Sequence, residues 1–305
     1  ISFFKLEKYT VMQYSKITMT TQHHNLGPVG DMGALELTNN GELSMTFIGS
    51  GSAFSKKFFQ NNALIVCGDN HTLIDCGSRT PEALALLGLS VTDIEYYFIT
   101  HSHADHIGGL EEVMLVNRYV AKKKPHLIAG KEYQHMLWNQ SLKGGAAYNE
   151  RHEGKALELT DLWDCLEPTP VPHADRGLMT LSLGALQFDI FRTKHIPDNA
   201  TSWKTSALSY GVVINKKVAY TSDTRFDPDL IEFLMANYKL EAIFHDCQLF
   251  TGGVHASMDE LATLPKEIKS KMYLMHYGDM ALTQPERAFM HGFKGFAEQW
   301  HTYSF

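Results

Sequence analysis

A run of six residues, His101-Ser102-His103-Ala104-Asp105-His106, constrains this chain more than any other segment of its 305 residues. It follows the apolar segment Tyr96–Ile99, which we expect to form a buried strand, and it precedes a helix expected over residues 109–121. Three imidazoles and one carboxylate at this spacing form a nitrogen and oxygen donor set that suits zinc or a similar divalent ion. The chain is therefore expected to fold so that one strand ends at a metal site.

The spacing within this run also indicates how the ligands are divided. His101 and His103 stand two residues apart on extended backbone, so their side chains point the same way. Asp105 and His106 come from the turn into the helix, and this turn can divide the four ligands between two ions. Glycines at 108–109 allow the backbone to fold tightly behind them. The alternative is a polar turn that contains histidines by chance, which suits a single His-X-His better than four donors.

Composition excludes some classes of function. Lys and Arg number 27 against 34 Asp and Glu, and the formal net charge is −7. Nonspecific electrostatic binding of nucleic acid needs a basic surface, which this composition excludes, and only binding through a local basic patch remains possible. No apolar run approaches the ~20 residues that span a bilayer, and we expect no membrane partner and no signal peptide. The four scattered cysteines do not suit a disulfide scaffold, which favours a cytoplasmic location.

Strands and helices alternate along the chain, which predicts a layered α/β architecture. Strands are expected, from their apolar or alternating character, over residues 45–49, 62–67, 71–74, 96–99, 126–129, 188–192, 209–214, 218–221, 242–245 and 272–275. Residues 144–184 have no clear period, and we interpret them as loop-rich cover over one face. We expect residues 1–43 to be an N-terminal appendage, either a hairpin or a dimer contact, ahead of a main domain over residues 44–305.

The six-residue run resembles the HxHxDH signature of the metallo-β-lactamase superfamily. The segment Leu73–Gly77 resembles the first motif of that superfamily, in which the aspartate, here Asp75, supports a metal-binding histidine. Three further motifs follow in the expected order, and their matching residues are His195, Asp223 in the segment Thr221–Thr224, and His276 in the segment Met275–Tyr277. The resemblance spans about residues 45–279.

Within the superfamily, the chain is most similar to the branch of ribonuclease Z and the cyclic-nucleotide phosphodiesterases. The turn Gly49–Ala53 resembles the "GTGSA" turn of that branch, and Val254–Ser257 resembles the "HST" segment whose histidine, here His255, assists catalysis. Members that process transfer RNA carry a long arm between the third and fourth motifs. Only 27 residues separate His195 from Asp223, so a short RNA end remains a possible substrate whereas transfer-RNA processing does not fit.

The resemblance implies a four-layer αββα sandwich with a dinuclear metal site at one edge. It assigns His101, His103 and His195 to one ion. It assigns Asp105, His106 and His276 to the other, with Asp223 as the bridge. Zinc is the expected metal, and manganese and iron remain alternatives. In this interpretation two divalent ions lower the pKa of bound water, so that hydroxide is available near neutral pH.

Some of these assignments have rivals in the sequence. His173 competes with His195 for the same ligand position, and we favour His195 because a strand precedes it. His255 is either the proton donor to the leaving alkoxide or a solvated loop histidine. His245 at a strand end either supports the ligands from behind, like Asp75, or is a core histidine.

The resulting prediction is a metal-dependent hydrolase that cleaves a phosphodiester, such as a cyclic nucleotide or an RNA end. Asp105, Asp223 and His255 are the residues expected to serve catalysis. A hydrolase of the same fold that acts on a lactone, thioester or β-lactam is the first alternative, and a non-enzymatic module with structural ions is the weakest. A homodimer is expected because relatives in this branch often pair.

Overall fold

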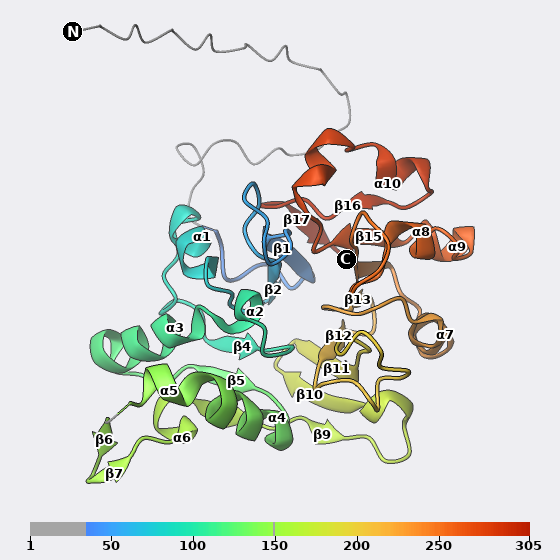
Figure 1. The fold of residues 1–305 in the computed structure, drawn as a ribbon. Coiled ribbons are helices and arrows are strands. Elements are labelled where there is room, and N and C mark those ends of the chain that lie inside the picture. Colours follow the sequence, from blue (N-terminus) through green and yellow to red (C-terminus); the bar gives the residue numbers. More distant parts are fainter. Residues whose placement is uncertain (1–34, 149) are drawn as a thin grey trace, which may run out of the picture.

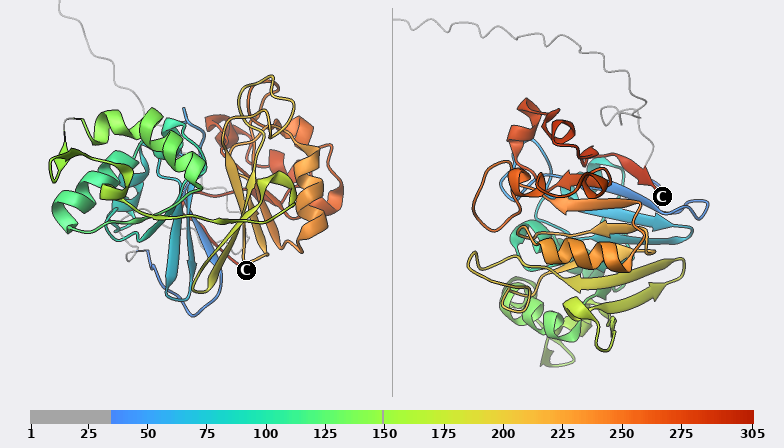
Figure 2. Two further views of the ribbon diagram at one scale, coloured as in Figure 1. Left: turned by 90° about the horizontal axis from the view of Figure 1, so that it is seen from below. Right: turned by 90° about the vertical axis from the view of Figure 1, so that its right-hand side faces the viewer.

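Two β-sheets pack face to face, and helices cover the outer face of each sheet (Figure 1). The computed structural model describes residues 35–148 and 150–305. Figure 2 shows the two sheets in the middle of the molecule, with helices from the first half of the chain on one side and helices from the second half on the other. The four-layer αββα sandwich that the sequence predicts is therefore confirmed.

The first sheet has seven strands. Its order is β17-β1-β2-β3-β4-β5-β8, and the strands are β1 (Ser44–Gly49), β2 (Asn62–Cys67), β3 (Asn70–Ile74), β4 (Tyr96–Phe98), β5 (His126–Ile128), β8 (Asp164–Leu166) and β17 (Thr302–Ser304). From β3 to β8 neighbouring strands are parallel, whereas β17, β1, β2 and β3 pair antiparallel. The C-terminal strand β17 thus closes the edge next to β1.

The second sheet has eight strands. Its order is β16-β15-β14-β13-β12-β11-β10-β9, and the strands are β9 (Thr169–Pro170), β10 (Met179–Leu183), β11 (Leu186–Arg192), β12 (Tyr210–Ile214), β13 (Val218–Tyr220), β14 (Ala242–Asp246), β15 (Met272–Met275) and β16 (Gly295–Phe296). From β13 to β16 the strands are parallel, and the others pair antiparallel. A small hairpin of β6 (Arg151–His152) and β7 (Lys155–Ala156) stands apart from both sheets.

Helices follow most of the parallel strands. The α-helices are α1 (Thr80–Leu86), α2 (Ala104–Ile107), α3 (Leu110–Val116), α4 (Lys131–Met136), α5 (Lys143–Ala146), α6 (Leu159–Leu162), α7 (Pro228–Asn237), α8 (Met258–Leu261), α9 (Lys266–Lys269) and α10 (Arg287–Met290). Two π-helical turns, Asn117–Ala121 and Leu137–Leu142, extend α3 and α4, and 3₁₀ turns lie at Asp175–Gly177 and Asp279–Thr283. None of the helices in the described part of the chain is long and apolar enough to cross a bilayer.

The main core lies between the two sheets. The ring of Phe47 on β1 is 5.0 Å from the ring of Phe244 on β14, measured between centroids. Strands of the second sheet are apolar on both faces: Val212 packs into this core, and its neighbour Val213 packs under the outer helices with Leu230 of α7. Because successive side chains of a strand point to opposite faces, a sheet covered on both sides needs such continuous apolar runs.

The interpretation of residues 144–184 as loop-rich cover was wrong. This segment contributes β8 to the edge of the first sheet and β9 and β10 to the edge of the second. These strands were missed because β8 has three residues and β9 has two, too few to show a period. Strand β10, Met179–Leu183, does alternate apolar and polar residues, and this signal was overlooked among the turn residues around it. The segment therefore links the two sheets rather than covering one of them.

The predicted N-terminal appendage lies mostly outside the described residues, because residues 1–34 are not described. Residues 35–43 are described and run along the first sheet. Leu35 donates a backbone hydrogen bond to Leu87, and the Asn39 side chain accepts one from Gly68 N. The proposed boundary at 43/44 coincides with the start of β1, and the dimer contact expected for residues 1–43 stays a prediction.

Strand direction explains where a site can form. The parallel strands β3 and β4 end at one edge of the first sheet, and β13, β14 and β15 end at the same edge of the second. Strand β11 runs in the direction of β13, because each pairs antiparallel with β12. Side chains that follow these strand ends are therefore brought together across the two sheets.

Candidate metal centre

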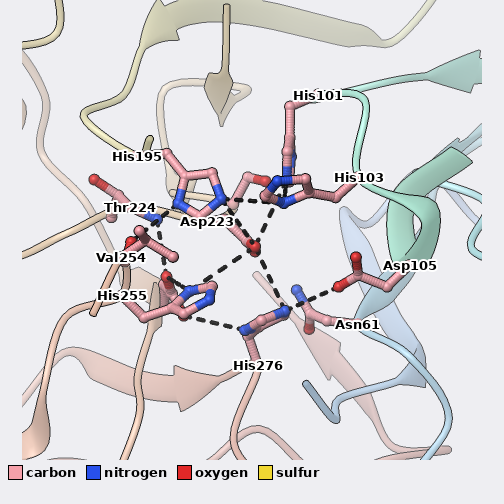
Figure 3. A network of polar contacts seen from close by, with 12 residues as sticks. Asn61, His101, His103, Asp105, His195, Asp223, Thr224, Val254, His255 and His276 are labelled. Carbon is pink, nitrogen blue, oxygen red and sulfur yellow. Dashed lines mark hydrogen bonds and ion pairs between the residues drawn. The ribbon is translucent and has the colours of Figure 1, made fainter. Parts of the chain in front are cut away.

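All seven residues predicted as metal ligands lie together at this edge. Figure 3 labels each of them except His106. They form two groups of four that share one residue: His101, His103, His195 and Asp223 in the first, and Asp105, His106, His276 and Asp223 in the second. Within each group the ligand atoms lie within 4.8 Å of one another. The sharing of Asp223 makes this one continuous cluster.

The first group combines one turn of the first sheet with two strand ends of the second. His103 Nδ1 is 3.0 Å from His101 Nε2 and 3.3 Å from His195 Nε2. Asp223 Oδ2 is 3.7 Å from the Nε2 atoms of His101 and His195. Ligands ~2.0–2.1 Å from a tetrahedral zinc ion lie about 3.4 Å from one another, so these separations fit a common ion.

The second group lies on the other side of Asp223. Asp105 Oδ2 is 3.3 Å from His106 Nε2 and 3.2 Å from His276 Nε2. Asp223 Oδ1 is 3.4 Å from His106 Nε2, and its Oδ2 is 3.5 Å from His276 Nε2. The second group therefore has the same spacing as the first, with two carboxylates and two imidazoles.

Buried polar atoms without a partner show that a cation fits here. Both carboxylate oxygens of Asp223 and Nε2 of His106 are buried and have no hydrogen-bond partner. Buried polar groups of this kind are costly unless something pairs with them. A divalent ion in each group would pair with all three atoms, and the mixed nitrogen and oxygen donors suit zinc, manganese or iron.

Asp75 contacts the candidate ligands of the first sheet. It follows β3 with a left-handed backbone (φ 63°), and its Oδ2 accepts a 2.7 Å hydrogen bond from His106 Nδ1. The same carboxylate accepts hydrogen bonds from the backbone N–H and the hydroxyl of Thr100. The tight approach of the two segments requires Gly77, where a Cβ would lie 2.0 Å from the Asp105 carbonyl oxygen. Asp75 therefore has the contact that the first-motif resemblance predicts for it.

Asp246, the last residue of β14, contacts the candidate ligands of the second sheet. Its Oδ2 accepts hydrogen bonds from His255 Nδ1 at 2.8 Å and from Thr224 N at 2.8 Å. Its Oδ1 is 3.4 Å from Nδ1 of His276. The remaining ligand of this sheet, His195, contacts the Val254 carbonyl oxygen through Nδ1 at 3.0 Å. Such contacts fix the ring orientation of a metal-binding histidine.

His255 lies beside the cluster and is more accessible than the ligands next to it. Its side chain is 22% exposed, against 2% for His276 and 0% for His195. Its ring stacks on that of His276 with 4.7 Å between centroids. Since Nδ1 is held by Asp246, Nε2 is the ring atom that is free to face a substrate.

The electrostatics divide the histidines into two sets. Burial lowers the pKa of His195 to about 4 and the pKa of His101 well below its usual value. Burial also disfavours the charged forms of His106 and His276, but the carboxylates around them, Asp223 first, outweigh it and raise both pKa values well above the usual range. Binding of a cation would release these protons, because a ligating imidazole is neutral.

Two histidines considered in the sequence lie elsewhere. His173 is exposed in a loop and belongs to neither group of donors, whereas its rival His195 is buried in the first group. His245 is buried, and its Nδ1 contacts the backbone carbonyl of Asp246 at 2.7 Å. The structure thus places the carboxylate of Asp246, and not the imidazole of His245, against the ligands.

Asp246 is a site residue that sequence reasoning did not single out. Adjacent residues in a strand point to opposite faces, so only one residue of the pair at the end of β14 can face the cluster. The alternation along β14 was the available signal, because Ala242 and Phe244 face the core between the sheets, as Asp246 then must.

Comparison with known proteins gives a family match over most of the chain. A family model described as "Anti-Pycsar protein Apyc1" matches residues 43–303. The anti-Pycsar protein Apyc1 of Bacillus phage vB_BsuM-Goe3 is 39% identical over 249 residues, which cover 77% of this chain and 89% of that protein.

Solved structures with the same fold are more distant in sequence. A diphosphatase from the PhnP family matches with a TM-score of 0.64 at 18% identity, covering 86% of this chain and 98% of its own. The metallo-β-lactamase fold protein YhfI from Bacillus subtilis matches with a TM-score of 0.63 at 16% identity, covering 87% and 100%. The predicted metallo-β-lactamase fold is therefore confirmed.

Proposed function

The chain belongs to the family of the anti-Pycsar protein Apyc1, and from this premise we propose that it hydrolyses the phosphodiester of a cyclic nucleotide with two divalent metal ions. A chain of this family and fold is a metal-dependent, phosphodiesterase-like hydrolase. The observation that carries the finer proposal is the single carboxylate of Asp223, which both groups of donors share.

The proposed ligand sets follow from the two groups. His101, His103 and His195 would hold one ion, Asp105, His106 and His276 the other, and Asp223 would bridge them. A structural zinc ion is closed by four protein ligands, whereas seven residues for two ions leave coordination positions free for water and substrate. When bound, such ions would lower the pKa of a bound water and neutralise the charge of the phosphodiester.

The chain itself supplies a proton donor. Burial lowers the pKa of His255, but the carboxylate of Asp246 outweighs this effect and raises the pKa above its usual value. The raised pKa favours the imidazolium form, in which Asp246 holds the Nδ1 proton and the Nε2 proton is available. We assign His255 the role of giving this proton to the leaving ribose oxygen, because an alkoxide is a poor leaving group without one.

We also propose that the protein is cytoplasmic and that its metal is zinc. The cysteines at 67, 76, 165 and 247 are free thiols in the structure, which fits a reducing cytoplasm. Imidazoles outnumber carboxylates in the ligand set, which favours zinc over magnesium or calcium.

A substrate panel with controlled metal content tests the proposal. Purified protein should hold about two metal ions per chain, and it should hydrolyse 3′,5′-cyclic nucleotides in preference to short RNA, a lactone and the β-lactam nitrocefin. Removal of the ions with a chelator should abolish turnover, and zinc or manganese should restore it. Activity on the lactone or nitrocefin alone would overturn the proposed substrate, and one fully closed ion per chain would overturn the dinuclear site.

A further inference from the structure

An apolar pocket of about 330 Å³ opens directly beside the candidate metal centre. His255 and His276 form its inner wall, and the rest of the lining comes from the turn after β1, the loop after β14 and the 3₁₀ turn after β15. Its size falls within the range of about 300–1,000 Å³ that small-molecule sites occupy. The pocket is therefore continuous with the site and not a separate surface feature.

Large apolar side chains stand exposed at the rim of this pocket. Phe54 is 87% exposed, Phe250 63% and Met280 52%. Each comes from a different one of the three segments that form the lining. Exposed apolar groups that gather around a concave site mark a surface that binds something.

The segments that carry these side chains are held in place by hydrogen bonds. The carboxylate of Asp279 accepts hydrogen bonds from the Ser55 hydroxyl and from the backbone N–H groups of Lys56 and Lys57, which ties the Phe54 turn to the Met280 turn. The base of the Phe250 loop is closed by the backbone of Gln248, which bonds to Ala256 and Met258. The rim is therefore built before any ligand arrives.

A second pocket on the other side of His255 has a different character. It measures about 190 Å³, and charged side chains of both signs line it, including Asp198, Arg225 and Glu260. A flat, uncharged aromatic ring suits the apolar pocket better, because it can stack on aromatic side chains there. The second pocket would instead surround the ring with charged groups.

We propose that the apolar pocket binds the nucleobase of the substrate, with Phe54 and Phe250 as the side chains on which the base stacks. This inference rests on the proposed function, because a cyclic nucleotide carries an aromatic base on the same ribose as the scissile phosphate. Phe54 and Phe250 are then specificity-determining residues. They bind the base while the metal centre acts on the phosphate, so their removal weakens binding and leaves the chemistry intact.

Kinetics on two substrates that differ only in the base test the inference. The pair is a 3′,5′-cyclic nucleotide and 1-O-methylribose 3′,5′-cyclic phosphate, which has the same phosphate ring and no base. Phe54→Ala and Phe250→Ala should each raise KM for the cyclic nucleotide about tenfold, with kcat within about twofold of the native value. For the base-free compound, measured as a substrate or as a competitive inhibitor, both variants should match the native protein.

Matched controls separate this role from others. Phe54→Tyr keeps an aromatic ring and should keep the native KM, and Tyr148→Ala removes an aromatic side chain that is 77% exposed and does not line the pocket. Equal losses on both substrates, or no loss on either, would overturn the inference. So would a change of oligomeric state in Phe54→Ala without a change in KM, because the rim would then contact a second copy of the chain. If the native protein hydrolyses neither substrate, the proposed function fails as well.

Discussion

The two sheets contribute to the candidate metal centre in different ways. The first sheet supplies His101, His103, Asp105 and His106 from one compact turn, which runs from the end of β4 into the first residues of α2. The second sheet supplies His195, Asp223 and His276 from three separate strand ends, spread over residues 195–276. The first set is positioned by local backbone geometry, whereas the second exists only when β11, β13 and β15 lie in their places in the sheet.

Asp223 is the residue of the second sheet that lies close to both His101 and His106 of the first. It belongs to the dispersed set, yet its Oδ2 is 3.7 Å from His101 and its Oδ1 is 3.4 Å from His106, both in the compact turn. It is therefore the residue through which the two halves of the site meet.

The largest effect is expected from Asp223→Asn. The amide keeps the size of the side chain but removes the charge and one acceptor atom, so one neutral oxygen is left and the residue can no longer bridge the two groups as a carboxylate. We expect turnover of a cyclic nucleotide to fall by more than about a thousandfold. Metal content, measured by mass spectrometry after dialysis, should fall below one ion per chain.

The matched control for this variant is Asp189→Asn, a carboxylate on β11 that bonds to Thr180 and lies outside the donor groups. It should keep its metal and its activity. If Asp223→Asn retained two ions and native turnover, the shared carboxylate would not be what joins the two halves.

The contrast between the halves also explains what the sequence could predict. Four donors within six residues after an apolar strand predict a metal-binding turn from local spacing alone. Asp75 was identified because its segment resembles the first motif of the superfamily. His195, Asp223 and His276 have no such spacing, and they were identified from the order of motifs in a known superfamily. Their proximity depends on strand order and direction, which no local pattern encodes.

Other features escaped prediction for physical reasons. Asp246 was passed over because its neighbour His245 is the more obvious ligand type, and only the alternation of β14 shows which of the two faces the site. Phe54, Phe250 and Met280 are ordinary apolar residues in sequence, and only the fold shows that they surround one pocket. Short edge strands such as β8 and β9 are stabilised by their neighbours and carry little pattern of their own.

A smaller loss of turnover than in Asp223→Asn is expected when one ligand is removed from only one half of the site. His103→Ala removes a ligand from the first group, and His276→Ala removes one from the second. Each variant should hold about one ion per chain and lose about a hundredfold to a thousandfold in turnover. The two variants differ in what else they remove. His276→Ala also removes contacts to Asp105 of the compact turn and to Asp246 of β14.

Thermal unfolding of the metal-free proteins separates the ligand effect from a folding effect. Both variants should unfold cooperatively near the temperature of the metal-free native protein. Two ions per chain in both variants would contradict the division into two groups, and loss of both ions in both variants would show that the groups do not bind independently.

The smallest effects are expected from the two supporting carboxylates, Asp75 in the first half and Asp246 in the second. Each accepts hydrogen bonds from a histidine Nδ1 and from a backbone N–H. In Asp75→Asn, the amide NH₂ would replace one of the two acceptor oxygens, so the hydrogen bond from Thr100 N or from His106 Nδ1 is lost. In Asp246→Asn, the NH₂ would face either the two donors at the Oδ2 position or Nδ1 of His276 at the Oδ1 position. We expect a loss of about 10–100-fold in metal affinity or turnover in both.

The pH dependence distinguishes these two variants. Burial lowers the pKa of His255, but the negative charge of Asp246 has the larger effect and raises this pKa. Loss of the Asp246 charge in Asp246→Asn should therefore lower the pKa of His255. A proton donor is active only below its own pKa. The fall in kcat on the alkaline side should therefore move to lower pH in Asp246→Asn and stay in place in Asp75→Asn, whose side chain holds His106 instead. An equal shift in both variants, or a shift in neither, would remove His255 from the role of proton donor. Neither half of the site would then supply a proton donor. The two halves would differ only in how the chain assembles them, from one compact turn or from three strand ends.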